Sequence, residues 1–92
     1  MKKRVHCFYA GRVQGVGFRM TAEETAQAMG VVGWVKNLRD GRVEIIAEAD
    51  EDLLKRFLNA LQHGAMKNFI TRTEISWGTA SDTFDAFEIR YY

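Results

Sequence analysis

The chain has 92 residues, of which 47% are hydrophobic and 27% are charged, and its formal net charge is +1. This length fits one domain over residues 1–92, and the near-neutral charge argues against nucleic-acid binding driven by phosphate neutralisation. One cysteine, Cys7, cannot form an internal disulfide, and no apolar run approaches the length of a membrane-spanning helix. We therefore expect a cytoplasmic protein without membrane or nucleic-acid partners.

The first predicted element is a strand at residues 4–10. Its residues alternate in character, which is typical of a strand with one buried face, here formed by Val5, Cys7 and Tyr9. The basic run at residues 2–4 is expected to be a solvated chain start.

A helix and a β-hairpin are predicted next. Residues 19–29 are rich in Ala, Glu, Gln and Met, which favour helix, and Gly30 suits the helix end. Residues 31–38 and 42–49 are read as two strands, because an Asp-Gly pair at residues 40–41 is a strong signal for a hairpin turn.

The second half of the chain predicts a helix followed by two strands. Asp50 suits the N-cap of the helix, and Gly64 follows its expected end. Strands are predicted at residues 71–79 and 86–91, separated by a loop. The buried stripe of the helix is expected to consist of residues at helical spacing, namely Leu53, Leu54, Phe57, Leu58 and Leu61.

The resulting order is β-α-β-β-α-β with a short fifth strand. This order is typical of the α+β class, in particular the ferredoxin-like split β-α-β sandwich. We therefore expect an antiparallel sheet with two helices on one face. The order of elements assigns no sheet edge to the last strand.

The segment between the first strand and the first helix carries three glycines: Gly11, Gly15 and Gly17. Glycine permits positive φ, so successive N–H groups can converge on an anion, and the following helix start adds unpaired donors. Arg19 stands at that helix start, where a cation is unfavourable, and its planar fork matches two phosphate oxygens. The residues fit a small-anion site, and they fit a glycine-rich turn beside a surface arginine equally well.

Asn37 lies near the end of its predicted strand, beside a loop. Asparagine at such a place commonly caps a turn. Its amide can also accept from one partner and donate to another, and so orient a water molecule without carrying charge. Both interpretations stay open from this residue alone.

Two segments together resemble the signatures of the acylphosphatase family. Residues 11–19, Gly-Arg-Val-Gln-Gly-Val-Gly-Phe-Arg, resemble the first signature, Gly-x-Val-Gln-Gly-Val-x-Phe-Arg. Residues 33–37, Gly-Trp-Val-Lys-Asn, resemble the second. The similarity covers nearly the whole chain. It departs at Ala49, where the family usually has glycine, and at Tyr9, where it usually has an aliphatic residue; we expect neither to alter the chemistry.

The resemblance implies hydrolysis of the carboxyl–phosphate bond of small acyl phosphates, with inorganic phosphate as product and inhibitor. It implies that Arg19 binds the phosphoryl oxygens and that Asn37 holds the attacking water. No cofactor or metal ion is implied, and we expect a monomer. The alternatives are a ferredoxin-like binding module and a carbamoyl-phosphate-handling domain. The remaining phosphate ligands that the resemblance implies are backbone N–H groups of the loop residues Gln14, Gly15, Val16, Gly17 and Phe18.

Overall fold

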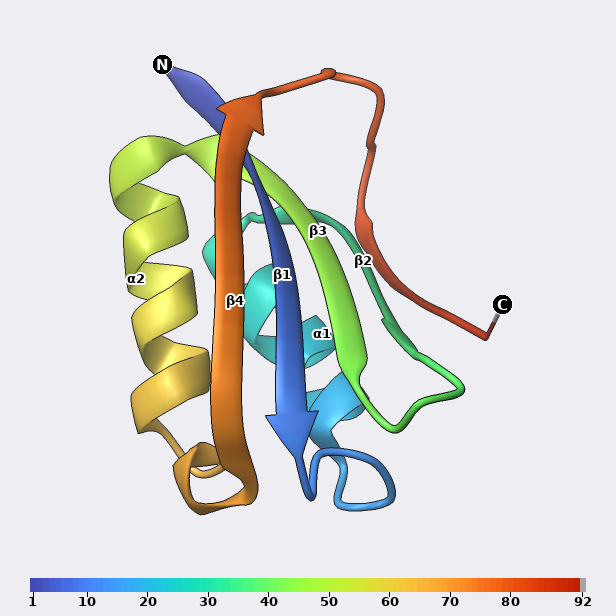
Figure 1. Cartoon of the computed structure of the whole chain (residues 1–92). Helices are drawn as coiled ribbons and strands as arrows, with labels where there is room; N and C mark the ends of the chain where they lie inside the picture. Colours follow the sequence, from blue (N-terminus) through green and yellow to red (C-terminus); the bar gives the residue numbers. More distant parts are fainter. Residues whose placement is uncertain (92) are drawn as a thin grey trace.

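The computed structural model describes residues 1–91. A five-stranded sheet has the strand order β4-β1-β3-β2-β5, and both helices pack on one of its faces (Figure 1). This confirms the ferredoxin-like α+β fold. The elements are β1 (Lys2–Gly11), α1 (Phe18–Met29), β2 (Val32–Asn37), β3 (Val43–Asp50), α2 (Glu51–His63), η1 (Lys67–Phe69), β4 (Ile70–Thr79) and β5 (Phe87–Arg90).

Strand β5 departs from the antiparallel sheet that the sequence predicts. Strands β1 to β4 do pair antiparallel, but β5 runs parallel to β2, with Gly33 opposite Phe87. The chain leaves β4 at one edge and crosses the end of the sheet to the other edge (Figure 1). This crossing reverses the chain direction, so β5 runs the same way as β2 and the sheet is mixed.

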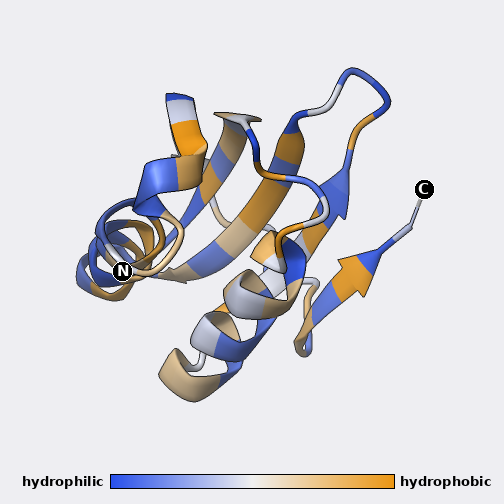
Figure 2. Ribbon diagram, turned by 90° about the horizontal axis from the view of Figure 1, so that it is seen from below, coloured by the Kyte–Doolittle hydropathy of each residue, from blue (hydrophilic) through white to orange (hydrophobic). Residues whose placement is uncertain are grey.

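The hydrophobic core lies between the sheet and the two helices. The alternation predicted for the first strand is confirmed, because Val5, Cys7 and Tyr9 are fully buried. Hydrophobic and hydrophilic bands alternate along the strands in Figure 2. The predicted stripe of α2 is buried except for Leu53, which is half-buried. The Phe57 ring on this helix lies 6.0 Å from the Phe87 ring of β5, measured between centroids.

The expectation for the chain start is wrong, whereas the expected N-cap of α2 is confirmed in position. The basic run is not a solvated chain start, because β1 already begins at Lys2 and the Arg4 Nε donates a hydrogen bond to Glu48. Asp50 does occupy the N-cap of α2, but its carboxylate makes no capping hydrogen bond. Instead, its Oδ1 lies 3.5 Å from the terminal ammonium of Met1.

Glu48 anchors the connection that carries the chain from β4 to β5. Its side chain is 2% exposed, and its carboxylate accepts hydrogen bonds from the Ser81 N–H at 2.9 Å and the Asp82 N–H at 3.0 Å. The Ser81 hydroxyl and the Arg4 guanidinium also donate to it. Burial alone would raise the pKa of Glu48, but these donors outweigh it and bring the pKa to about 2.

Candidate active site

The glycine-rich segment forms a loop between β1 and α1, and both of its ends are anchored in the core. Val13 and Phe18 are each 1% exposed, and the Phe18 ring lies 5.3 Å from the Tyr9 ring, measured between centroids. Between these anchors, Gly15 and Gly17 have φ values of 77° and 83°. A Cβ at either glycine would meet open space, so the left-handed backbone, and not crowding, favours glycine there.

Backbone donors of this loop have no acceptor in the described chain. None of the N–H groups of residues 14–20 donates a hydrogen bond to an acceptor within residues 1–91. The first helical bond of α1 runs from the Thr21 N–H to the Gly17 carbonyl at 3.0 Å. The first turn contains no acidic side chain. Unpaired N–H groups and the positive end of the helix therefore meet at the loop, which favours an anion there.

Arg19 is the second residue of α1 and is half-buried. Within residues 1–91, no carboxylate forms an ion pair with its guanidinium. Its Cζ lies 5.2 Å from the centre of the Tyr91 ring, which is within the range of a cation–π interaction. This contact leaves the positive charge in place, so the guanidinium can still bind an anion.

Asn37 is the last residue of β2, at the strand end where the sequence predicts it. Its Oδ1 is buried and has no hydrogen-bond partner within residues 1–91. A buried acceptor without a hydrogen bond lowers the stability of the fold by about 1–3 kcal/mol. Most buried acceptors in proteins therefore have a hydrogen-bond partner. An unsatisfied acceptor at this place therefore suits a donor from a bound molecule.

One pocket of about 180 Å³ brings the two predicted segments together. Arg19 and Asn37 both line it, although they lie on different elements. It is smaller than the roughly 300–1,000 Å³ typical of sites for drug-sized ligands, and so suits a small substrate. A larger hollow of about 440 Å³ lies beside Trp77 and contains neither segment. The other residues of the smaller pocket are Val13, Gly15, Gly17, Phe18, Met20, Ile89 and Tyr91.

Two loop residues that the sequence places at the site do not line this pocket. The Gln14 Nε2 donates hydrogen bonds to the Leu38 carbonyl at 2.7 Å and the Arg42 carbonyl at 3.0 Å. Its side chain thereby ties the loop to the β2–β3 hairpin that carries Asn37. Val16 is half-buried and packs against the hydrophobic core.

Three residues that line the pocket were not predicted from the sequence: Met20, Ile89 and Tyr91. The sequence could have indicated Met20, because it is a large apolar residue directly after Arg19 in a polar helix start. No sequence pattern indicated Ile89 and Tyr91, since their position depends on which edge of the sheet β5 occupies.

Comparison with known proteins agrees with the two signatures. The family model named Acylphosphatase matches residues 5–89 of this chain. The chain belongs to the acylphosphatase family. It is 42% identical to the acylphosphatase of Bacillus velezensis over 86 residues, which cover 94% of this chain and 96% of that one. It is 37% identical to the acylphosphatase of Salinibacter ruber over 89 residues, covering 97% and 94% of the two chains.

Structural comparison supports the same family. The fold matches the crystal structure of acylphosphatase from Bacillus subtilis with a TM-score of 0.90 and 36% sequence identity, covering 97% of this chain and 99% of that one. The chain therefore hydrolyses the carboxyl–phosphate bond of acyl phosphates, as the resemblance predicts. Neither alternative, the binding module or the carbamoyl-phosphate domain, gains support from these family members.

Residues 1–91 contain neither a metal-binding cluster nor a membrane-spanning helix. No group of three His, Cys, Asp or Glu side chains there is arranged so that it could hold a metal ion. No helix in this part of the chain is both long enough and apolar enough to cross a membrane.

Proposed function

We propose that Arg19, Asn37 and the backbone N–H groups of residues 14–18 hydrolyse small acyl phosphates without a metal ion. One observation carries this proposal. The unpaired guanidinium and the unpartnered buried Oδ1 share a single small pocket with the glycines of the loop. The pocket thus offers positive charge for a phosphoryl group and an acceptor for a water molecule.

The phosphoryl group is bound by the loop and Arg19. The guanidinium presents two parallel N–H donors to two phosphoryl oxygens, and the loop N–H groups and the start of α1 surround the remaining charge. These donors are held in place by the buried anchors Val13 and Phe18. Preorganised donors favour the transition state, because they do not have to reorient as charge shifts toward the leaving group.

Asn37 holds the attacking water. An O–H of the water donates to the Asn37 Oδ1, which directs an oxygen lone pair toward phosphorus. The water oxygen forms a bond to phosphorus while the bond from phosphorus to the bridging oxygen breaks. The electron pair of the broken bond leaves with the carboxylate, and the water proton passes to a phosphoryl oxygen.

The leaving group explains why the pocket can work without a general acid. A carboxylate is a weak base, so it departs without being protonated first. Arg19 is the single charged side chain among the described residues that line the pocket. Its charge and the loop donors supply the electrostatic stabilisation that metal ions provide in many other phosphoryl-transfer sites.

The test replaces Arg19 with alanine and follows hydrolysis of benzoyl phosphate by ultraviolet absorbance. We expect kcat/KM to fall by a factor on the order of 10³ or more, and inhibition by inorganic phosphate to weaken. Arg12→Ala is the matched control, because Arg12 is an exposed arginine in the same loop that does not line the pocket. Near-normal activity of Arg19→Ala would overturn the proposal, and loss of wild-type activity in EDTA would overturn its metal-free part.

The same proposal extends to the form of the working protein. We infer that residues 1–92 act as a single domain, as a monomer, in the cytoplasm. The mean hydropathy of −0.26 and the near-neutral charge are ordinary for such a domain. Light scattering at enzyme-assay and higher concentrations tests the monomer, since a dimer would double the measured mass.

A further inference from the structure

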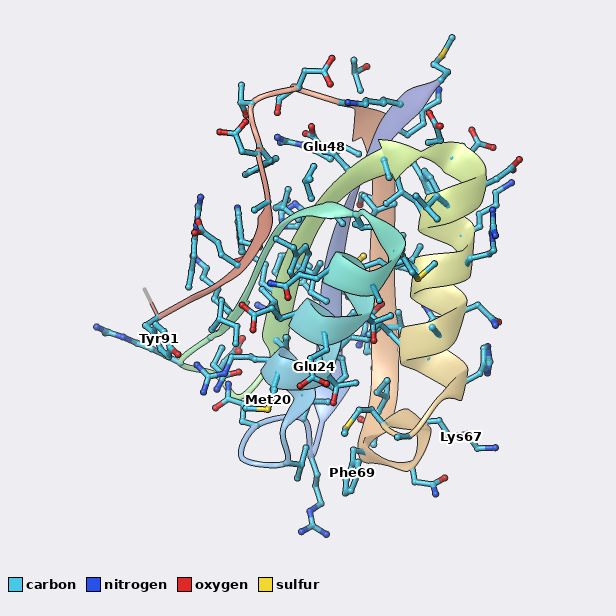
Figure 3. The ribbon with its side chains drawn as sticks, turned by 180° about the vertical axis from the view of Figure 1, so that it is seen from behind. Met20, Glu24, Glu48, Lys67, Phe69 and Tyr91 are labelled. Carbon is cyan, nitrogen blue, oxygen red and sulfur yellow. The ribbon has the colours of Figure 1, made fainter. Side chains whose placement is uncertain are left out.

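Two exposed apolar side chains border the proposed phosphate pocket. Met20 is 60% exposed and Tyr91 is 73% exposed, and both line the pocket. Met20 comes from the first turn of α1, and Tyr91 follows β5. Large apolar side chains that gather at one exposed place commonly mark a binding surface. Figure 3 shows both of them on the same side of the molecule, well away from Glu48.

The chemistry of the pocket divides it into two parts. Arg19 and Asn37 are the polar side chains of the lining, and Gly15 and Gly17 contribute backbone. The rest of the lining is predominantly apolar: Val13, Phe18, Met20, Ile89 and Tyr91. A single guanidinium can balance the phosphoryl group, and the lining that residues 1–91 provide then has no second cation for a charged acyl part.

The position of Tyr91 connects these two parts. Its ring lies over the Arg19 guanidinium at 5.2 Å. A phosphoryl group bound by Arg19 therefore has the Tyr91 ring close by, where the acyl part begins. Met20 follows Arg19 directly in α1, and its flexible thioether side chain can adapt to an aromatic ring.

From this arrangement we infer that Met20 and Tyr91 form an acyl subsite that selects acyl phosphates with an apolar acyl group, aromatic ones above all. This inference rests on the proposed function, because Arg19 must hold the phosphoryl group for the acyl part to reach these two side chains. The enzyme then prefers benzoyl phosphate to acetyl phosphate, and it discriminates against acyl groups that carry a second carboxylate, such as succinyl phosphate.

The experiment compares kcat/KM for benzoyl phosphate and acetyl phosphate in the wild type, Met20→Ala and Tyr91→Ala. We expect the benzoyl-to-acetyl ratio to fall roughly fivefold or more in each variant, because the lost side chain contacts only the larger acyl group. Met20→Leu and Tyr91→Phe should restore most of the ratio, since they keep the apolar surface. Trp77→Ala is the matched control, because Trp77 is also exposed but lies far from this pocket.

The benzoyl-to-acetyl ratio of kcat/KM decides whether the acyl subsite is correct. If both substrates lose activity equally in Met20→Ala and Tyr91→Ala, or if neither changes, the acyl subsite is wrong. Product inhibition of the wild type gives a second measurement that needs no variant. Benzoate should inhibit several-fold more strongly than acetate or succinate, and equal inhibition by all three carboxylates would also overturn the inference.

Arg19→Ala separates this inference from the proposed function. If the phosphate site is correct and only the subsite is wrong, Arg19→Ala still abolishes hydrolysis of both substrates while the ratio in Met20→Ala stays at the wild-type value. If the phosphate site itself is wrong, Arg19→Ala keeps its activity on both substrates.

Discussion

Arg19 and Asn37 each occupy a position that costs the fold free energy. A cation at a helix start is unfavourable by about 0.3–1 kcal/mol, and a buried acceptor without a partner costs about 1–3 kcal/mol. Both residues line the same pocket. Local costs that gather at one site are expected where selection for function has outweighed selection for stability.

Asn37→Ala tests the water-holding role. We expect kcat to fall by a factor on the order of 10², because one positioning group is lost, while the inhibition constant of inorganic phosphate changes by less than about twofold. Stability should not fall, since the substitution removes an unpartnered buried oxygen. Steady-state kinetics and thermal unfolding measure both, with Asn59→Ala on the exposed face of α2 as control. A collapse of phosphate affinity would show that Asn37 binds the anion and not the water.

The site is assembled from three elements that meet at one end of the sheet. The first turn of α1 brings Arg19, with the loop before it; the β2–β3 hairpin brings Asn37, and the segment after β4 brings Tyr91. Gln14 joins the first two of these elements through its two hydrogen bonds to the hairpin. The relative placement of phosphate donors and water holder therefore depends on a side chain that does not line the pocket.

Gln14→Leu tests that placement. The substitution removes both hydrogen bonds, so we expect about 1 kcal/mol lower stability and roughly tenfold lower kcat, because a small displacement of Asn37 misaligns the water. Gln27→Leu is the matched control, since the Gln27 Nε2 donates to the Phe87 carbonyl, away from the loop. The prediction fails if Gln14→Leu lowers the melting temperature as expected but leaves kcat at the wild-type value.

Within residues 1–91, both helices cover the same face of the sheet (Figure 1). At one end of the sheet, the connection between β4 and β5 is fastened by Glu48, whose carboxylate accepts hydrogen bonds from Arg4, Ser81 and Asp82 (Figure 1). This attachment needs the ionised carboxylate, because all of its partners donate hydrogen bonds. The stability of the fold is thereby linked to pH.

The pH dependence of unfolding tests the role of Glu48. Its pKa is about 2 in the folded protein, below the ordinary value of 4.5, so the ionised form contributes stability above pH 4.5 that is lost as the pH falls toward 2. The loss should reach about 3 kcal/mol, and Glu48→Gln should remove most of this dependence. Urea unfolding between pH 7 and pH 2 measures it. The control Glu24→Gln, on an exposed carboxylate of α1, should keep the wild-type slope; an equally steep slope in Glu48→Gln contradicts the prediction.

The sequence by itself determined the order of the elements, the buried faces of β1 and α2, and the two segments of the site. These properties are local, because hydrophobic periodicity, an Asp-Gly turn and a glycine-rich loop are encoded by residues close together in the chain. Even the strand end at Asn37 follows from the turn that comes directly after it. The sequence likewise predicted Arg19 at a helix start, because the glycine-rich loop ends at Gly17, two residues before it.

Only the tertiary structure decided where β5 pairs and which residues complete the pocket. The Glu48 carboxylate accepts a hydrogen bond from Ser81, which is 33 residues away along the chain. No periodicity in either segment predicts that contact. The same holds for Tyr91, which meets Arg19 because the chain crosses the end of the sheet before forming β5. Contacts between distant segments are selected by how the whole core packs, and so the acyl side of the site becomes visible only in the folded molecule.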